Sequence, residues 1–127
     1  MARFLWICLG GAMGTGARYL LSTWVARGAG SGFPWGTFAV NVIGSFLLGL
    51  LLQVALTTGS PGPTLRLTLA TGVLGGFTTY SSFNYETLAL LQEGEWALGL
   101  SNILGTVFAC LVAGWLGLVV GRGVAGN

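Results

Sequence analysis

The segment of residues 72–86 carries polar groups that could do chemistry inside a long hydrophobic run. It reads GVLGGFTTYSSFNYE, so it combines three glycines, hydroxyl groups, aromatic rings and one carboxylate, Glu86. Closely spaced glycines weaken a helix. In a membrane, irregular backbone is tolerated only where it is buried in protein or lines a wet cavity. We therefore predict a functional site in this segment.

Two kinds of ion contact follow from a break in this segment. Gly75 and Gly76 permit the break, after which the carbonyls of residues 75–78 would lose their helical partners and could bind a cation through oxygen. The half-helix that starts near Thr79 would direct amide donors and a positive dipole end inward, which favours an anion.

The half-helix after the break has two chemically different faces. Tyr80 and Phe83 are spaced i, i+3 on one face, and Ser82 and Glu86 are spaced i, i+4 on another. Aromatic rings have positive edges, so a ring edge in a narrow pore can contact a small anion without binding it too tightly. An isolated aromatic pair at this spacing more often indicates plain packing.

Two further hydrophobic runs carry polar stripes with four-residue spacing. The stripes are Thr37, Asn41 and Ser45 in one run and Asn102, Thr106 and Cys110 in the other. An interhelical hydrogen bond of Asn41, worth about 1 kcal/mol, would by itself explain the first stripe. Two stripes in different helices favour a polar path.

The first hydrophobic run places two glycines and an arginine on one helical face. Gly10, Gly14 and Arg18 recur every four residues, and the glycines indicate close helix packing. A guanidinium in a membrane helix needs a route to the interface or a polar partner. We interpret Arg18 either as an interfacial structural residue or as a group that attracts anions into a vestibule.

The composition indicates an integral membrane protein and disfavours an enzyme. Of 127 residues, 54% are hydrophobic and 6% are charged, and the mean hydropathy is +0.82. The charged residues are five arginines and three glutamates, with no lysine, aspartate or histidine. Few groups remain for acid–base catalysis. The scattered arginines form no footprint for nucleic acid, so the expected surroundings are membrane lipid.

The hydrophobic pattern predicts an all-α fold with four membrane helices in a single domain of residues 1–127. The predicted helices are 4–25, 36–56, 65–91 and 96–120, with the third broken mid-membrane. Each is long enough to cross the hydrocarbon core of about 30 Å. A cleaved signal peptide at the start is the less favoured alternative, because the apolar character resumes after Arg18.

The arginines divide almost evenly between the two faces of the membrane. An even number of crossings places both termini on one side, together with Arg3, Arg66 and Arg122, against Arg27 and Arg18 on the other. Orientation follows such asymmetry in short loops. The weak bias is compatible with insertion in both orientations and also with a single orientation.

Three motifs in order resemble the Fluc/CrcB family of bacterial fluoride channels. They are G-x-x-x-R in the first helix, G-T-x-x-x-N-x-x-G in the second and G-x-x-G-G-x-T-T-[aromatic]-S-x-F-x-x-E in the third. The resemblance covers essentially the whole chain. It implies a multi-pass channel of the bacterial inner membrane that passively exports cytoplasmic fluoride, built as an antiparallel, dual-topology homodimer with two pores and a structural sodium ion at its interface.

The resemblance also assigns roles to individual residues. It implies that the backbone carbonyls of Gly75 and Thr78 hold the sodium ion. The implied fluoride pore consists of Asn41, Tyr80, Ser81, Ser82, Phe83, Thr106 and Cys110. The supporting polar residues are Arg18, Thr37, Thr79, Glu86 and Asn102.

Two residues depart from the family pattern, and one different function competes with the channel. Tyr80 stands where phenylalanine is usual and adds a phenol donor, and Cys110 replaces a serine with a weaker donor. The alternative is a small dual-topology, proton-coupled transporter of another small solute. Such a carrier needs a titratable carboxylate, for which Glu86 is the candidate.

Overall fold

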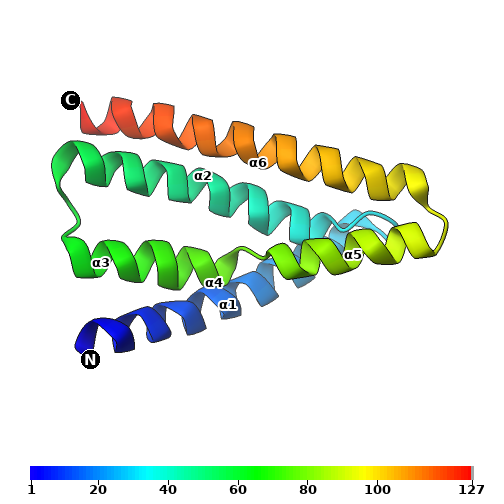
Figure 1. The fold of residues 1–127 in the computed structure, drawn as a ribbon, viewed down its shortest axis with the longest axis horizontal. Helices are drawn as coiled ribbons and strands as arrows, with labels where there is room; N and C mark the ends of the chain where they lie inside the picture. Colours follow the sequence, from blue (N-terminus) through cyan, green and yellow to red (C-terminus); the bar gives the residue numbers. More distant parts are fainter. Residues whose placement is uncertain (127) are drawn as a thin grey trace.

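A computed structural model describes residues 1–126 and contains four helical rods with no strand in that range (Figure 1). The elements are α1 (Ala2–Ala29), α2 (Trp35–Thr58), α3 (Pro63–Leu67), the π-helix η1 (Thr68–Leu74), α4 (Gly75–Phe77), α5 (Tyr80–Gln92) and α6 (Trp96–Ala125). Together α3, η1, α4 and α5 form the third rod. The predicted all-α class and its four helices are confirmed. Asn127, the last residue of the predicted domain, lies outside the described residues.

The rods run alternately up and down, so both termini lie at the same end of the molecule (Figure 1). The α2–α3 connection lies at that end, and the α1–α2 and α5–α6 connections lie at the other. Gly59 ends α2 in the left-handed conformation at φ 69°, and its N–H donates to the Ala55 carbonyl. This is a common way to end a helix, because glycine lacks the Cβ that would strain this backbone. Pro63 then opens α3 at a position where its missing N–H costs nothing.

Glycines bring α1 into backbone contact with the third rod. A Cβ added to Gly72 would lie 2.7 Å from the Ile7 carbonyl oxygen, and one added to Gly76 would lie 2.6 Å from the Gly11 carbonyl oxygen. Gly14 faces the Val73 carbonyl in the same way. No larger residue fits these contacts, so the predicted close packing of the first helix through small residues is confirmed.

The third rod is interrupted within the predicted region, residues 75–79, but the two glycines are not the interrupted residues. Gly75 is helical, with φ −65° and ψ −37°, and both glycines belong to α4. The backbone becomes extended at Thr78 and Thr79, where ψ is 159° and 117°. Because Gly76 has no side chain, α1 can pack directly against its backbone. The break begins two residues later, and hydrogen bonds from outside the rod hold it open.

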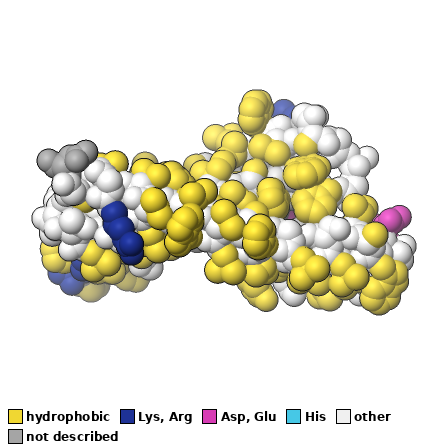
Figure 2. Space-filling model, turned by 90° about the horizontal axis from the view of Figure 1, so that it is seen from above, with side chains coloured by type: hydrophobic (Ala, Val, Ile, Leu, Met, Phe, Trp, Pro, Cys, Tyr) yellow, Lys and Arg dark blue, Asp and Glu magenta, His cyan; other side chains and the backbone are white. Residues whose placement is uncertain are grey.

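The outer surface is apolar, whereas much of the interior is small or polar. Two helices, α2 and α6, are long and apolar enough to cross a membrane by length and composition. Along α6, Leu104, Phe108, Leu111 and Trp115 are 61–71% exposed. Hydrophobic side chains cover much of the face seen in Figure 2, and the charged side chains visible there lie mainly toward the two ends. Such continuous apolar surface is stable in lipid or against another protein, not in water.

The buried residues include a group of polar side chains in the interior of the helical bundle. They are Thr37, Thr79, Thr87, Asn102 and Thr106, each at most 8% exposed. Buried polar groups are stable only when they are hydrogen-bonded. Their bonds therefore define how α2, α5 and α6 meet.

Candidate functional site

Two cavities lie on either side of the break in the third rod. The larger has a volume of about 720 Å³ and the smaller about 420 Å³. Thr79, the second residue of the break, lines both. The extended segment is therefore the partition between two hollows of the same chain.

Asn41 on α2 holds the break open with both ends of its amide. The Thr79 N–H donates to Asn41 Oδ1 over 2.8 Å, and Asn41 Nδ2 donates to the Thr79 carbonyl over 3.0 Å. Thr79 is 7% exposed, so its backbone groups need protein partners. The amide thus replaces the bonds that a continuous helix would make. The interhelical bond considered for Asn41 exists, and the same residue also lines the smaller cavity.

The carbonyls of residues 75–78 lose their helical donors at the break, and among these residues Gly75 and Thr78 line the smaller cavity. In a continuous helix the Thr79 N–H would donate to the Gly75 carbonyl, and the Ser82 N–H would donate to the Thr78 carbonyl. The first amide donates to Asn41 instead, and the second caps α5 by donating to Thr79 Oγ1 over 3.2 Å. The carbonyl oxygens of Gly75 and Thr78 are therefore left for other partners, and both residues line the smaller cavity.

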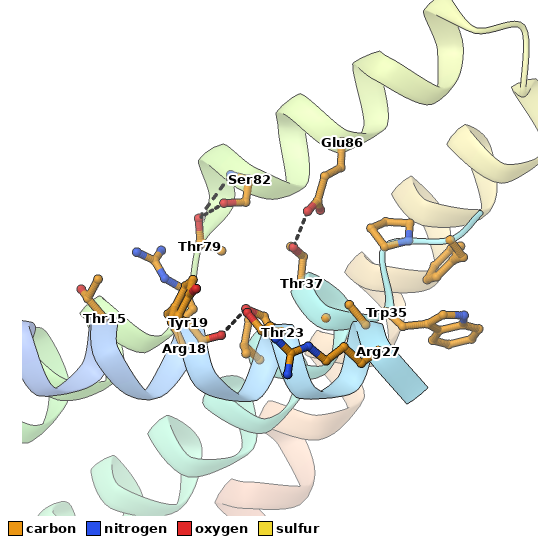
Figure 3. A pocket seen from close by; sticks show the side chains of 16 residues that line it. Thr15, Arg18, Tyr19, Thr23, Arg27, Trp35, Thr37, Thr79, Ser82 and Glu86 are labelled. Atoms are coloured by element: carbon orange, nitrogen blue, oxygen red, sulfur yellow. Dashed lines mark hydrogen bonds between the residues drawn. The ribbon is translucent and has the colours of Figure 1, made fainter. Parts of the chain in front are cut away.

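The larger cavity is a polar vestibule that opens at the end opposite the termini. Figure 3 shows Thr15, Arg18, Tyr19, Thr23 and Arg27 of α1 along one wall, facing Thr79, Ser82 and Glu86 of the third rod. Two guanidiniums face a single carboxylate among these lining residues. A cavity with an excess of positive charge attracts anions.

The hydroxyl of Ser82, at the start of α5, can donate into this vestibule, whereas Ser81 is exposed and lines neither cavity. Thr79 Oγ1 donates to Ser82 Oγ over 3.1 Å and lies 3.3 Å from Ser81 Oγ. Ser82 accepts in this bond, so its own hydrogen is available to a ligand. One helical turn further along α5, Thr37 Oγ1 donates to Glu86 Oε1 over 2.7 Å. Glu86 Oε2 is buried without a hydrogen-bond partner among the described residues.

The predicted aromatic pair lies beside the smaller cavity, but its two rings have different surroundings. The Tyr80 and Phe83 ring centroids are 5.7 Å apart and the planes are tilted by 49°. Phe83 is 9% exposed, whereas Tyr80 is 78% exposed. Both rings line the cavity together with Thr106 and Cys110 of α6. One ring is held by the packing of this chain, and the other projects beyond it.

A buried chain of hydrogen bonds connects α5 to the polar stripe of α6. Thr87 Oγ1 donates to the Phe83 carbonyl over 2.7 Å, and Asn102 Nδ2 donates to Thr87 Oγ1 over 2.8 Å. Thr106 Oγ1 donates to Asn102 Oδ1 over 3.0 Å. The α6 stripe is thus partly occupied in holding α5, and only its Thr106 and Cys110 positions reach the smaller cavity.

Residues 5–118 match the family described as "CrcB-like protein, Camphor Resistance (CrcB)", which is most of the chain. The chain belongs to the CrcB family. It is 61% identical over 122 residues to the "Fluoride-specific ion channel FluC" of Sorangium cellulosum (strain So ce56), covering 96% of each chain. The protein of the same description from Anaeromyxobacter sp. (strain K) is 54% identical over 126 residues, covering 99% of this chain and 100% of the relative. That of Geobacter sulfurreducens is 50% identical over 122 residues, covering 96% and 98%.

The family predicted from the three motifs is therefore confirmed. In this CrcB chain the third motif is divided between the two cavities, and its residues Gly75, Thr78, Tyr80 and Phe83 share the smaller one with Asn41. Ser82 and Glu86 face the vestibule, on the other side of the partition.

Two residues of this CrcB chain were missed as site residues. The sequence predicted for Arg27 only a place at one face of the membrane, yet it lines the vestibule together with Arg18. Thr87 lies one residue beyond the segment in which we predicted the site. A signal for Thr87 exists in the sequence, since it lies four residues after Phe83 on the same helical face. A lone threonine at that spacing is too common to single out.

Proposed function

We propose that this chain is a fluoride-selective channel, not an enzyme, that lets fluoride leave the cytoplasm passively and so lowers its toxicity. Whole-length similarity to relatives described as fluoride-specific ion channels supports this function. The structural observation that carries it is the position of Thr79 between a positively charged vestibule and a cavity lined by hydroxyls and ring edges.

The chemistry of the lining suits a small, strongly hydrated anion. Fluoride enters a pore only if donors replace its water, since a desolvated ion without partners is very costly. Ser82 offers a hydroxyl hydrogen, the second N–H of Asn41 is not used by Thr79, and Phe83 offers a ring edge. Among the described residues, no charged side chain lines the smaller cavity, which favours passage over trapping.

We further propose that the channel is an antiparallel homodimer with two pores in the bacterial inner membrane. Each chain would cross the membrane four times, with the break in the third rod near the middle of the bilayer. Both termini lie at one end (Figure 1), as an even number of crossings requires. The 78% exposure of Tyr80 supports a partner on that face, because a pore-lining ring needs an opposite wall. The near balance of arginines between the two ends supports dual topology.

A structural sodium ion is proposed at the dimer interface, held by the carbonyls of Gly75 and Thr78. Within residues 1–126 no three His, Cys, Asp or Glu side chains gather as a metal site, so a cation there would rely on backbone oxygens. The two carbonyls fit this role because the amides of Thr79 and Ser82 bond elsewhere. When bound, the ion would supply positive charge that links the two chains at their breaks.

Fluoride efflux from liposomes tests the proposed function. Purified protein should discharge a fluoride gradient when a potassium ionophore clamps the membrane potential, with little movement of chloride. Phe83→Ile should sharply reduce fluoride efflux because it removes the ring edge while keeping an apolar side chain. Equal chloride and fluoride efflux would contradict selectivity.

The same liposomes distinguish a channel from a proton-coupled transporter. A carrier that uses Glu86 should acidify or alkalinise the lumen in step with its solute and should stop with Glu86→Gln. A channel moves charge without this coupling.

A further inference from the structure

The direction of the buried hydrogen-bond chain between α5 and α6 follows from the number of hydrogens that its members carry. A threonine hydroxyl has one hydrogen, and an asparagine amide has donors on one side and an acceptor on the other. Thr87 uses its hydrogen on the Phe83 carbonyl, over 2.7 Å. It can therefore only accept from Asn102, whose Nδ2 lies 2.8 Å away.

This direction determines what Thr106 presents to the smaller cavity. With Asn102 Nδ2 turned toward Thr87, Asn102 Oδ1 faces Thr106 and takes its single hydrogen, over 3.0 Å. Thr106 lines the cavity, but in this state it offers only oxygen lone pairs, which repel an anion. Thr87, Asn102 and Thr106 are 6%, 1% and 5% exposed, so water does not readily replace these bonds.

We propose that Thr87 is a positioning residue for conduction, which keeps the Thr106 hydroxyl hydrogen away from the pore until an anion arrives. This inference rests on the proposed fluoride channel and deepens it. An anion at Thr106 is accommodated when the chain reverses: the Asn102 amide turns over, Nδ2 donates to Thr106, and Thr106 donates to the anion. Thr87 then donates to Asn102 Oδ1 and gives up its bond to the Phe83 carbonyl.

The lost bond makes anion binding at Thr106 weaker than a free hydroxyl would allow. When the hydrogen-bond chain reverses, the Phe83 carbonyl loses the hydroxyl of Thr87 and gains no new donor in its place. A site that binds weakly releases its ion quickly, and conduction requires binding that is favourable enough for entry yet weak enough for exit. The effect is imposed on the α6 stripe from α5, by a residue that does not line either cavity.

The test measures the fluoride concentration that half-saturates flux through the reconstituted channel. Thr87→Val keeps the side-chain shape but removes the hydroxyl. The hydrogen bond to the Phe83 carbonyl is then absent before the anion binds, so anion binding no longer breaks it. We expect the half-saturating concentration to fall roughly three- to tenfold, the equivalent of one hydrogen bond. Thr87→Ser keeps the hydroxyl and should restore the wild-type value. Thr68→Val is the matched control, because Thr68 makes the same local bond to the Thr64 carbonyl over 2.9 Å without an asparagine partner.

Two further variants keep the inference open to refutation. Asn102→Leu removes the acceptor that holds the Thr106 hydrogen, and it should also lower the half-saturating concentration. In a Thr106→Val background, Thr87→Val should have no effect on it. An unchanged or raised value in Thr87→Val, or the same fall in the Thr106→Val background, overturns the inference. If the wild-type protein passes no fluoride at all, the proposed function fails as well.

Discussion

Replacing Asn41 with leucine should either destabilise the protein or rejoin the third rod into a continuous helix. The substitution removes both amide bonds to the Thr79 backbone, of 2.8 and 3.0 Å. It leaves a buried N–H and a buried carbonyl without partners, since Thr79 is 7% exposed. Each orphaned buried group costs about 1–3 kcal/mol, so the loss should be about 2–6 kcal/mol. That is a large share of a typical unfolding free energy of about 5–15 kcal/mol.

The chain can recover part of this loss only by restoring a helix at the break. The Thr79 N–H would then return to the Gly75 carbonyl, so the partition between the two cavities would change its backbone path. Fluoride flux should therefore be lost whether the variant is destabilised or rejoined. Loss of flux with little loss of stability would indicate the rejoined helix.

The measurement is thermal unfolding in detergent, followed by tryptophan fluorescence at one fixed protein concentration, together with fluoride efflux from liposomes. The fixed concentration matters because an oligomer's apparent stability depends on it. Thr57→Val is the control, because Thr57 is exposed and its hydroxyl bonds only to Gln53 one turn earlier, so the substitution should change stability by no more than about 0.5 kcal/mol. Wild-type stability and wild-type flux in Asn41→Leu would refute the role assigned to this amide.

Three other substitutions test separate parts of the structure. Gly76→Ala should prevent stable folding, because the added Cβ would lie 2.6 Å from an α1 carbonyl oxygen. Gly105→Ala is the control and should fold normally, because the space around Gly105 is open. The yield of monodisperse protein measures both outcomes. Tyr80→Phe should leave stability within about 0.5 kcal/mol of wild type, since it keeps the ring and removes only the hydroxyl. A large loss in a thermal melt would mean that the phenol is structural. Arg27→Gln should reduce fluoride flux at about 0.01 M ionic strength and not at about 1 M, where charges are screened within a few ångströms. Arg27→Lys, which keeps the positive charge, should show no such salt dependence.

The positions of the helices could be predicted from the sequence because bilayer thickness and local chain chemistry determine them. A run of about twenty apolar residues is a spanning helix, and glycines and prolines mark where such runs end. The predicted helices 4–25, 36–56 and 96–120 each lie inside an observed helix, α1, α2 and α6. The family was also predictable, because the motif around residues 72–86 is specific and contiguous.

Helical periodicity also identified which polar residues share a face, but not what each one does there. Asn41 and Thr37 lie one turn apart on α2, yet Asn41 bonds the backbone of Thr79 and Thr37 bonds the carboxylate of Glu86. Spacing of four residues is the same in both cases. The partner depends on where α2 crosses the third rod, and no local pattern encodes that crossing.

The exact place where the third helix opens was decided by tertiary structure alone. Local chemistry favoured Gly75 and Gly76, the residues with the weakest helix propensity, but both are helical because α1 packs against their rod. The helix opens at Thr79, where an amide from a residue 38 positions away offers better bonds than the helix does. The sequence by itself determined the helices, the membrane class and the family, because those depend on neighbours along the chain. The break, the partition between the two cavities and the hydrogen-bond chain through Thr87 depend on groups that only folding brings together.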